Sequence, residues 1–287
     1  MRLVNLFTGQ KRLILENFKS YKNIQLNNPK DNYNFFVFWD DYLMTGEEKK
    51  ILNNSLNNFE YKIINKEKFL KLFKSEFNQI KFDKLLKKND KNQLIAWLHQ
   101  YYILYEAFKF AKKCLGKKSE SYLWQRIRSD NYIPNKINIK QILKDKVSLN
   151  FPGAKFGFGL NDFHCIGSFK YFKDYAETIK LIKILIKNSI YLPPEVIIST
   201  QLIRKKSLYT INRSLPACLI GSKEGKTYLR SWKLREKGYQ YIDFNFSNFN
   251  SKSKYLDKSE SYIISFLRRF IYSFEDLYQN LTFNFRK

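Results

Sequence analysis

Two short apolar runs near the amino terminus constrain the fold of this chain more than any other feature. Residues Leu3–Phe7 form one run, which ends in Thr8-Gly9, and residues Phe35–Trp39 form another, which ends in Asp40-Asp41. Runs of this kind are typical of strands that are buried on both faces of a sheet. The stretch between them is long enough for a crossover helix from Lys11 to about Ile24. The sequence therefore predicts a β-α-β unit with a parallel sheet.

A long helix from about Gln93 to Cys114 is the clearest helical prediction. Its apolar residues recur at intervals of three and four, and Lys112-Lys113 with Gly116 form a C-terminal stop signal. The preceding segment, 46–92, is rich in Lys and Asn and is predicted to form solvated helices on one flank. His99 lies on the long helix with no second metal ligand nearby, so we expect it to be structural.

The remaining elements extend the same α/β pattern. We expect a helix from Ser168 to about Lys187, a helix opened by Pro193-Pro194-Glu195, a strand over Leu208–Asn212 and a helix from about Ser259 to Gln279. The predicted fold class is α/β, with a mostly parallel central sheet flanked by helices and a helical C-terminal extension. We expect residues 1–221 to form the core and residues 222–287 to form the basic, partly helical extension.

The stretch Tyr122–Asp130 places two arginines and a carboxylate where an apolar strand ends. In an extended strand Arg126, Arg128 and Asp130 share one face, about 6.5 Å apart per step. The sequence has 11 Arg against 41 Lys, so two Arg within three positions stand out. The planar guanidinium grips phosphate oxygens in a way that Lys does not, which predicts a phosphate site. A salt-bridged strand edge is the alternative interpretation.

Composition excludes several classes of protein. The formal net charge is +26, but the lysines are spread along the chain, which fits genomic bias, affinity for anionic lipid or acidic ligands, or, less well, nucleic-acid binding. Three separated cysteines and two histidines argue against a disulfide framework, a zinc site or a histidine-rich metal centre. No secretory signal or membrane-spanning run is evident, so a cytoplasmic protein with reduced thiols is expected.

Several motifs together resemble one family. Gly9-Gln10-Lys11-Arg12 follows the first strand, and acidic residues end the second. Arg126-x-Arg128-x-Asp130 follows the long helix, Asn161-Asp162 and Ile166-Gly167-Ser168 come next, and Pro194-Glu195 follows. This order resembles bacterial glycosyltransferases of capsular-polysaccharide and lipopolysaccharide synthesis, whose fold is the nucleotide-diphospho-sugar transferase type (GT-A-like). The resemblance covers roughly residues 1–215.

The resemblance implies a nucleotide-sugar donor and a glycan or lipid-linked acceptor. It implies donor contacts at Gly9, Gln10 and Arg12, in addition to Arg126, Arg128 and Asp130, and we add Arg213 as a further phosphate contact. Asp130 occupies the place of the carboxylate that binds the donor diphosphate through Mn²⁺ or Mg²⁺ in metal-dependent relatives. Because no second Asp stands two positions away, the two arginines are an alternative means of neutralising the leaving diphosphate.

Glycosyl transfer also requires a base for the acceptor hydroxyl. Asp162, in a glycine-bracketed loop expected just before a helix, is the first candidate and Glu195 is the second. Both also fit a structural role near a helix start. His164 is a weaker candidate between apolar neighbours. A basic nucleic-acid-binding protein and a catalytically inactive transferase-like protein remain as alternatives, although the lysines form no single stripe.

The charge and the predicted tail helix raise a membrane hypothesis. Arg268-Arg269 lies beside the apolar face of the tail helix, and such a surface suits peripheral docking to the anionic cytoplasmic leaflet. An apolar helix face is more often packed into a core than placed on a membrane, so both interpretations stay open.

Overall fold

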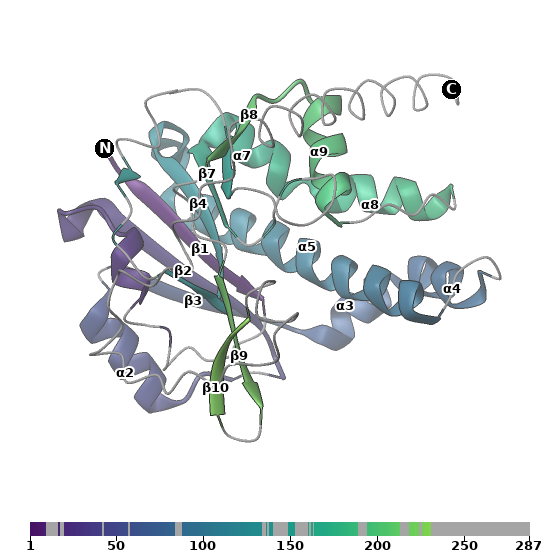
Figure 1. Cartoon of the computed structure of the whole chain (residues 1–287), viewed down its shortest axis with the longest axis horizontal. Coiled ribbons are helices and arrows are strands. Elements are labelled where there is room, and N and C mark those ends of the chain that lie inside the picture. The colour runs from purple at the N-terminus through teal and green to yellow at the C-terminus, as the bar shows by residue number, and fades with distance from the viewer. Residues whose placement is uncertain are drawn as a thin grey trace.

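The computed structural model describes most of residues 1–230 (Figure 1). Outside the description are residues 10–16, 18–19, 42, 57, 84–87, 134–135, 137, 140–148, 153–159, 161, 163, 189–193, 213–217, 224–225 and 231–287. The side chains of 88–90, 132, 150, 152, 194–195, 210–212, 218–223 and 226–230 are outside it too. Gln10, Arg12, Arg213 and the tail helix expected over 259–279 therefore lie outside the described residues.

A seven-stranded sheet forms the centre of the described part of the chain. Its strands, in spatial order, are β3 (Phe59–Ile64), β2 (Asn32–Trp39), β1 (Leu3–Gly9), β4 (Leu123–Arg128), β7 (His164–Ser168), β6 (Leu149–Pro152) and β8 (Tyr209–Asn212). The first four strands are mutually parallel, β7 is antiparallel to both of its neighbours, and β6 is parallel to β8. The mostly parallel α/β sheet expected from the sequence is confirmed.

A second, three-stranded sheet lies beside the first. It consists of β5 (Asn131–Tyr132), β9 (Cys218–Lys223) and β10 (Lys226–Arg230), with β9 in the middle and antiparallel to both neighbours. The boundary expected after residue 221 falls within β9. The division into a core and an extension stays a prediction.

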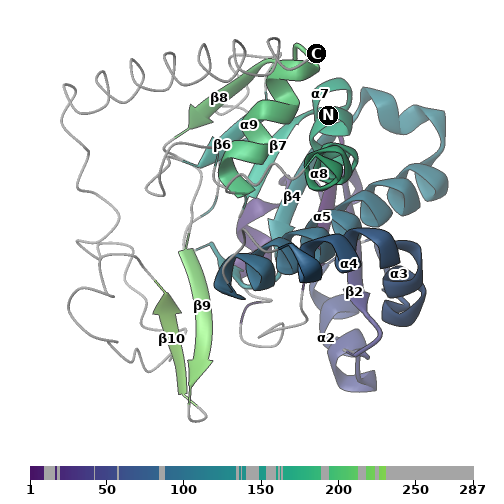
Figure 2. The ribbon, with the colours of Figure 1, turned by 90° about the vertical axis from the view of Figure 1, so that its right-hand side faces the viewer.

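Helices cover both faces of the central sheet. They are α2 (Gly46–Ser55), α3 (Lys66–Leu72), α4 (Lys74–Phe82), α5 (Lys88–Leu115), α7 (Phe169–Ala176), α8 (Thr178–Lys187) and α9 (Pro194–Arg204), with 3-10 turns η1 (Lys22–Ile24), η2 (Pro29–Asp31) and η3 (Lys117–Ser121). Figures 1 and 2 show α5 running along one face, between the sheet and α8, with α2 on the opposite side. Among the described helices none is long and apolar enough to cross a membrane.

The side chains of β1 alternate between the two faces of the sheet, and this explains why the protein has a hydrophobic core on each face. Val4 and Leu6 are buried in a core with α5, α7 and α8, whereas Leu3 and Phe7 are buried in a second core with η1 and α2. All four side chains have zero exposure, so the strand is covered on both faces, as its unbroken apolar run predicts. The sheet therefore offers ligands its strand ends rather than its faces.

Several helix signals in the sequence act as expected, and others do not. Thr45 and Glu48 form a reciprocal capping box at the start of α2, and α9 begins at Pro194 as predicted. The single helix expected from Ser168 to Lys187 is wrong in detail, because α7 and α8 are separated at Glu177. Strand β3 was not anticipated within the flank that was expected to be helical.

Candidate active site

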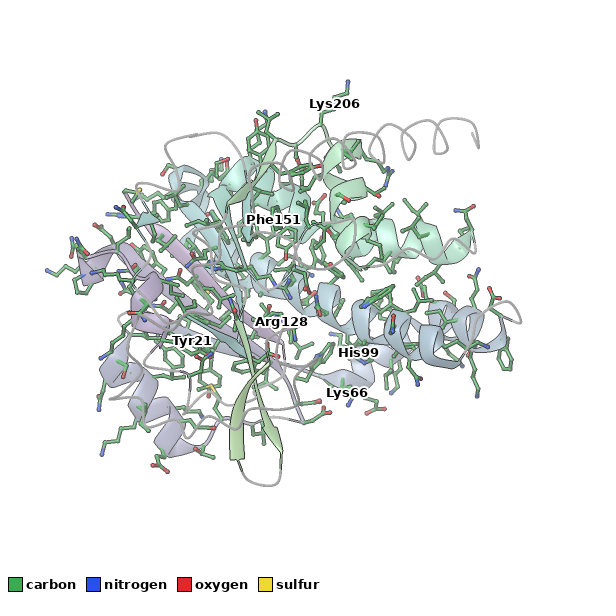
Figure 3. All side chains as sticks on the ribbon, viewed as in Figure 1. Tyr21, Lys66, His99, Arg128, Phe151 and Lys206 are labelled. Atoms are coloured by element: carbon green, nitrogen blue, oxygen red, sulfur yellow. The ribbon has the colours of Figure 1, made fainter. Side chains whose placement is uncertain are left out.

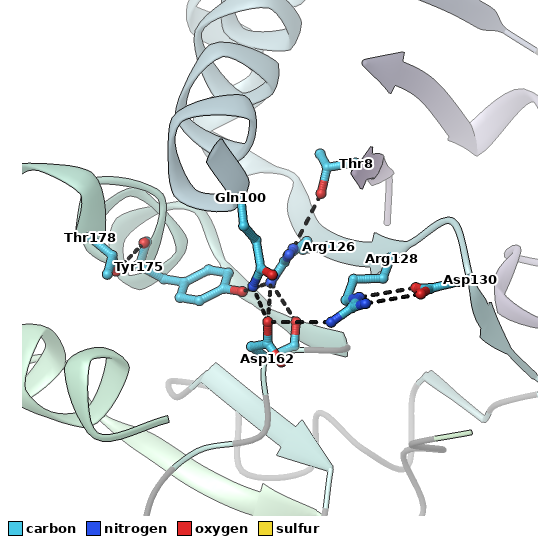
Figure 4. Close-up of polar contacts among 8 residues, drawn as sticks. All are labelled: Thr8, Gln100, Arg126, Arg128, Asp130, Asp162, Tyr175 and Thr178. Carbon is cyan, nitrogen blue, oxygen red and sulfur yellow. Dashed lines mark hydrogen bonds and ion pairs between the residues drawn. The ribbon is translucent and has the colours of Figure 1, made fainter. Parts of the chain in front are cut away.

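The candidate site lies at the carboxyl ends of β1 and β4, where the antiparallel β7 begins. The register pairs Arg126 with Cys165 and Ile127 with His164, so residues just before β7 lie beside the end of β4. Asp162 therefore reaches the same edge as Arg126 and Arg128 (Figure 4). Its expected position just before a helix is wrong, because β7 separates it from α7.

Arg126 is fully buried beneath α5 and α7. Its Nε donates to Thr8 Oγ1 at 3.3 Å, and its Nη1 donates to the Tyr175 hydroxyl at 2.7 Å and to the backbone oxygen of Asp162. Burial alone would lower the pKa of Arg126, but Tyr175 and the Asp162 carboxylate raise it above its ordinary value. Among the described residues no acceptor lies within hydrogen-bond distance of Nη2. Arg126 is thus a buried cation with one unused donor group.

Arg128 and Asp130 form a bidentate ion pair. Arg128 Nε donates to Asp130 Oδ1 at 3.0 Å, and Nη2 donates to Oδ2 at 2.9 Å. The three-residue ladder expected from the sequence is wrong for Asp130, because β4 ends at Arg128 and a turn carries Asp130 back onto the guanidinium. The Arg128 side chain keeps 25% exposure, so it is the part of the pair that a ligand can reach.

Three polar residues of the first crossover hold this turn in place. Asn17 Nδ2 donates to the backbone oxygens of Ser129 and Asn131, at 3.0 and 2.9 Å, and the Tyr21 hydroxyl donates to Ser129 at 2.8 Å. Asn23 donates to the Ile133 oxygen at 2.7 Å. Because they bind backbone oxygens more than a hundred residues away, no local pattern marks these side chains as part of the site.

Asp162 lies between the two guanidinium groups. Its Oδ2 accepts a hydrogen bond from Gln100 of α5 and is 3.7 Å from Arg126 Nη1 and 3.9 Å from Arg128 Nη1. The carboxylate is 6% exposed. We call Arg126, Arg128, Asp130 and Asp162 the arginine cluster. Its two positive and two negative charges balance formally, so net charge alone does not attract an anion to the cluster.

Gly9 shapes the adjacent end of β1. Its φ of +122° is a conformation that residues with a Cβ rarely adopt, which explains the glycine. A Cβ at this position would lie 3.9 Å from Ser129 Oγ, so space alone does not require glycine. Glu195 falls in the first turn of α9, where only its backbone is described. The roles expected for Gly9 and Glu195 stay predictions.

A second polar network crosses the opposite face of the sheet. We call Gln25, Asn34, Asn5, Gln125 and His164 the amide ladder. Gln125 Nε2 donates to Asn5 Oδ1 at 2.8 Å, and Asn5 Nδ2 donates to Asn34 Oδ1 at 3.0 Å. His164 Nε2 lies 2.9 Å from Gln125 Oε1, which fixes the proton on that nitrogen. Burial lowers the pKa of His164 to about 3, so it is a neutral member of the sheet interior.

His99 and Cys165 are packed among core side chains. His99 packs against Trp39 and Phe69, with ring centroids at 5.3 and 4.6 Å, and its Nδ1 lies 2.8 Å from the Ile95 oxygen. Burial raises the pKa of Cys165 to about 12, so its thiol is not an activated nucleophile. The expectation of a structural His99 agrees with this packing.

The residues of the site do not form a ready-made cation site. Both oxygens of Asp130 accept hydrogen bonds from Arg128, so a Mn²⁺ or Mg²⁺ ion would first have to displace that pair. In the part of the chain that the structure describes, no three His, Cys, Asp or Glu side chains gather as metal ligands. The arrangement fits direct binding of anionic oxygens by guanidinium groups better than binding through a metal.

No protein-family model and no curated protein sequence matches the chain. Among solved structures, mouse xyloside xylosyltransferase 1 in its apo form is similar over 74% of this chain and 84% of that chain, with 8% identity and a TM-score of 0.41. Core-mannan synthase A from Aspergillus fumigatus, in a Mn/GDP form, is similar over 79% and 76%, with 10% identity and a TM-score of 0.45. Both of these similar structures are glycosyltransferases. Neither likeness assigns a residue, a donor or an acceptor to this chain.

Proposed function

We propose that this protein is a glycosyltransferase that uses a nucleotide-sugar donor. The observation that carries the proposal is the arginine cluster at the carboxyl ends of β1 and β4, the edge where open α/β sheets bind ligands. There Arg126 is fully buried with a donor group that has no acceptor in the described structure, and the partly exposed Arg128 lies beside it. A diphosphate is the kind of ligand that matches two adjacent guanidinium groups.

The position of the arginines supports a functional role. Burial of a charged group is costly unless it is paired, and a well-packed apolar residue often serves stability as well. Most cations of this chain are lysines. Lys206 points outward at the edge of the molecule (Figure 3), whereas Arg126 is fully buried. A guanidinium fork in the interior, in a chain that mostly uses lysine, is best explained by recognition of a planar or phosphate-like group.

Donor binding is expected to proceed by exchange of anions. A diphosphate oxygen takes the place of Asp130 on Arg128, because the cluster has no net charge with both carboxylates in position. Gly9 allows the backbone to approach the donor at the end of β1. Gln10 and Arg12, which follow it in sequence, and Arg213 complete the proposed donor set. Arg126 and Arg128 then stabilise the charge that develops on the leaving diphosphate.

Asp162 is the proposed base for the acceptor hydroxyl, and Glu195 is the second candidate. The carboxylate of Asp162 lies next to both arginines, so an acceptor held there attacks close to the leaving diphosphate. Gln100 orients the carboxylate by donating to Oδ2. As in the family that the sequence resembles, the proposed acceptor is a glycan or a lipid-linked glycan in surface polysaccharide synthesis, in the cytoplasm.

Calorimetric titration with a panel of nucleoside diphosphates and nucleotide sugars tests the proposal. One nucleotide family should bind selectively, and Arg128→Lys should weaken its binding about tenfold because the charge remains but the fork is lost. Arg2→Lys is the matched control, since Arg2 is exposed at the opposite end of the same sheet and donates to Tyr122. Binding of nucleic acid with no selective nucleotide would favour the nucleic-acid alternative. Selective binding without turnover would identify an inactive transferase-like protein.

The role of a divalent cation is tested separately. If the arginines neutralise the diphosphate directly, turnover should be the same with and without a chelator, and Asp130→Asn should keep the chelator response unchanged. The opposite result would be that the native protein loses turnover on chelation and regains it with Mn²⁺ or Mg²⁺, while Asp130→Asn does not respond to the added cation. That result would assign the cation to Asp130.

A further inference from the structure

Helices α4 and α8 end together in a surface that is both basic and apolar. Lys183 Nζ is 3.5 Å from Glu76, and Gln79 Nε2 donates to the backbone oxygen of Ile186. From the first contact to the second, the residue number rises by three on α4 and by three on α8. The two helices therefore run in the same direction, side by side (Figures 1 and 2). The end of α4 at Phe82 therefore lies level with the end of α8.

We define the tip patch as Lys81, Phe82, Lys183, Ile184 and Lys187. Phe82 is 71% exposed and Ile184 is 43% exposed. Single exposed apolar side chains are common on protein surfaces, so the feature that matters here is that these two lie on adjacent helices among lysines. On α4 the buried Ile80 faces the core, which leaves Phe82 on an outer face that adjoins α8. On α8 Lys183, Ile184 and Lys187 share one outward face.

The charge around the tip patch is strongly positive. Helices α3, α4 and α8 together contain eight lysines and two glutamates, and both glutamates are paired with lysines of the same helices. Lys91 of α5 adds its ammonium group, which donates to the Lys81 backbone oxygen at 2.8 Å. Asp83 is the acidic residue at the end of α4 and is partly buried. Lysines thus surround the exposed Phe82 and Ile184.

We propose that the tip patch docks the protein on a membrane surface that contains anionic phospholipid. Lysines attract the headgroups, while an aromatic and an aliphatic side chain insert at the boundary between headgroups and acyl chains. Nucleic acid fits less well, because single strands bind in basic grooves with several aromatic side chains on which successive bases stack, whereas this surface presents one aromatic and one aliphatic side chain. The inference goes beyond the proposed glycosyl transfer and does not depend on it.

Sedimentation with vesicles of phosphatidylcholine, with and without phosphatidylserine, tests the proposal on the full chain. The native protein should bind the anionic vesicles and should detach as salt is added, because screening weakens the attraction. Lys81→Glu with Lys187→Glu should lower binding by about tenfold or more. Phe82→Ser should lower it roughly fivefold, since it removes the inserted side chain but keeps the charge.

Matched controls separate the tip patch from the overall charge. Lys117→Glu with Lys118→Glu makes the same charge change on exposed residues of η3, beyond the other end of α5, and Leu43→Ser removes an apolar side chain that is 67% exposed. Both controls should bind like the native protein. Equal binding to neutral and anionic vesicles, or equal losses in controls and tip variants, would overturn the proposal. The proposal would also be overturned if the double variant Arg268→Glu with Arg269→Glu lost vesicle binding while the tip-patch variants bound normally.

Discussion

The two faces of β4 carry two buried polar networks of different chemistry. Gln125 points into the amide ladder, and the next residue, Arg126, points into the arginine cluster on the other face. The ladder is neutral, and its amide groups pair with one another across β1, β2 and β4. The cluster is charged, lies at the strand ends, and keeps an unused donor group on Arg126 within the described structure.

Under the proposed function, this difference distinguishes a network that serves the fold from one that serves a ligand. A neutral network whose amide groups pair with one another inside the protein fixes the register of the strands, since a shift of one residue would exchange Gln125 and Arg126 between faces. In the described structure its buried atom without a hydrogen-bond partner is His164 Nδ1, which carries no charge. A charged network with spare donors at a strand end has capacity for an outside anion. Variants in the two networks should therefore fail in different ways.

The largest effect is expected on turnover when the cluster loses its proposed base. Asp162→Asn keeps the size of the side chain and an oxygen that accepts from Gln100, and it removes a negative charge beside the two arginines, so donor affinity should not fall. Turnover with the nucleotide sugar selected by titration should fall roughly 100-fold to 10,000-fold, the usual contribution of a positioned general base. Steady-state kinetics with parallel unfolding curves separate a rate defect from a folding defect.

Glu195→Gln is the comparison variant and should do far less. If Asp162→Asn has normal turnover and Glu195→Gln is inactive, Glu195 is the base and Asp162 is not. If both variants unfold early without a specific rate defect, both residues are structural and the base lies elsewhere.

Removal of the buried guanidinium should have the next largest effect, on stability. Arg126→Met leaves Asp162 buried with one cation fewer and should lower the free energy of unfolding by about 3–5 kcal/mol in urea titration. Arg128→Met should cost less, because the Arg128 side chain is 25% exposed, whereas Arg126 is fully buried. Equal losses would show that burial does not distinguish the two arginines.

The amide ladder should respond in stability but not in ligand binding. Gln125→Leu removes the partners of Asn5 Oδ1 and His164 Nε2 and should lower the free energy of unfolding by about 2–3 kcal/mol. Nucleotide affinity, measured by calorimetry, should remain native. A drop in affinity as large as that of Arg128→Lys would mean that the two networks are not independent.

The effect that is smallest near neutral pH is the protonation of His164, and it grows as the solution becomes acidic. Burial lowers the pKa of His164 from 6.5 to about 3, so the folded protein keeps it neutral while the unfolded chain protonates it below 6.5. Its contribution to stability is present above that pH and is lost as pH falls toward 3, by about 1.4 kcal/mol per unit. Urea titrations from pH 7 to pH 4 should show a shallower decline for His164→Gln than for the native protein. If the free energy of unfolding falls equally with pH in the native protein and in His164→Gln, His164 does not titrate in this way.

Strong local signals predicted much of the fold. The apolar runs of β1 and β2 and the helical periodicity of α5 reflect burial, and burial leaves a pattern in the sequence. Strand β7 has no such pattern, because His164 and Gly167 interrupt the apolar residues of a five-residue strand, of which four are buried between β4 and β6. Strand β3 was missed because its exposed Glu60 and Tyr61 resemble a solvated flank.

The candidate site was only partly predictable for a related reason. The sequence placed Arg126, Arg128 and Asp130 at one strand end, but the turn that returns Asp130 to Arg128 depends on distant side chains such as Asn17. The approach of Asp162 to Arg126 depends on the antiparallel course of β7. Contacts between residues far apart in sequence leave no local signal, whereas strand and helix periods do.

The position of β1 between β2 and β4 has a consequence for the order in which the chain can fold. On one side β1 pairs with a strand that follows shortly in sequence, but on the other its partner lies 120 residues later, as between Asn5 and Gln125. During synthesis that edge of β1 stays without its partner until β4 emerges. Closure of such a long loop costs chain entropy before the pairing of β1 with β4 can stabilise the sheet, which makes this a slow step. The candidate site assembles only after this step, when Asp162 joins the strand ends.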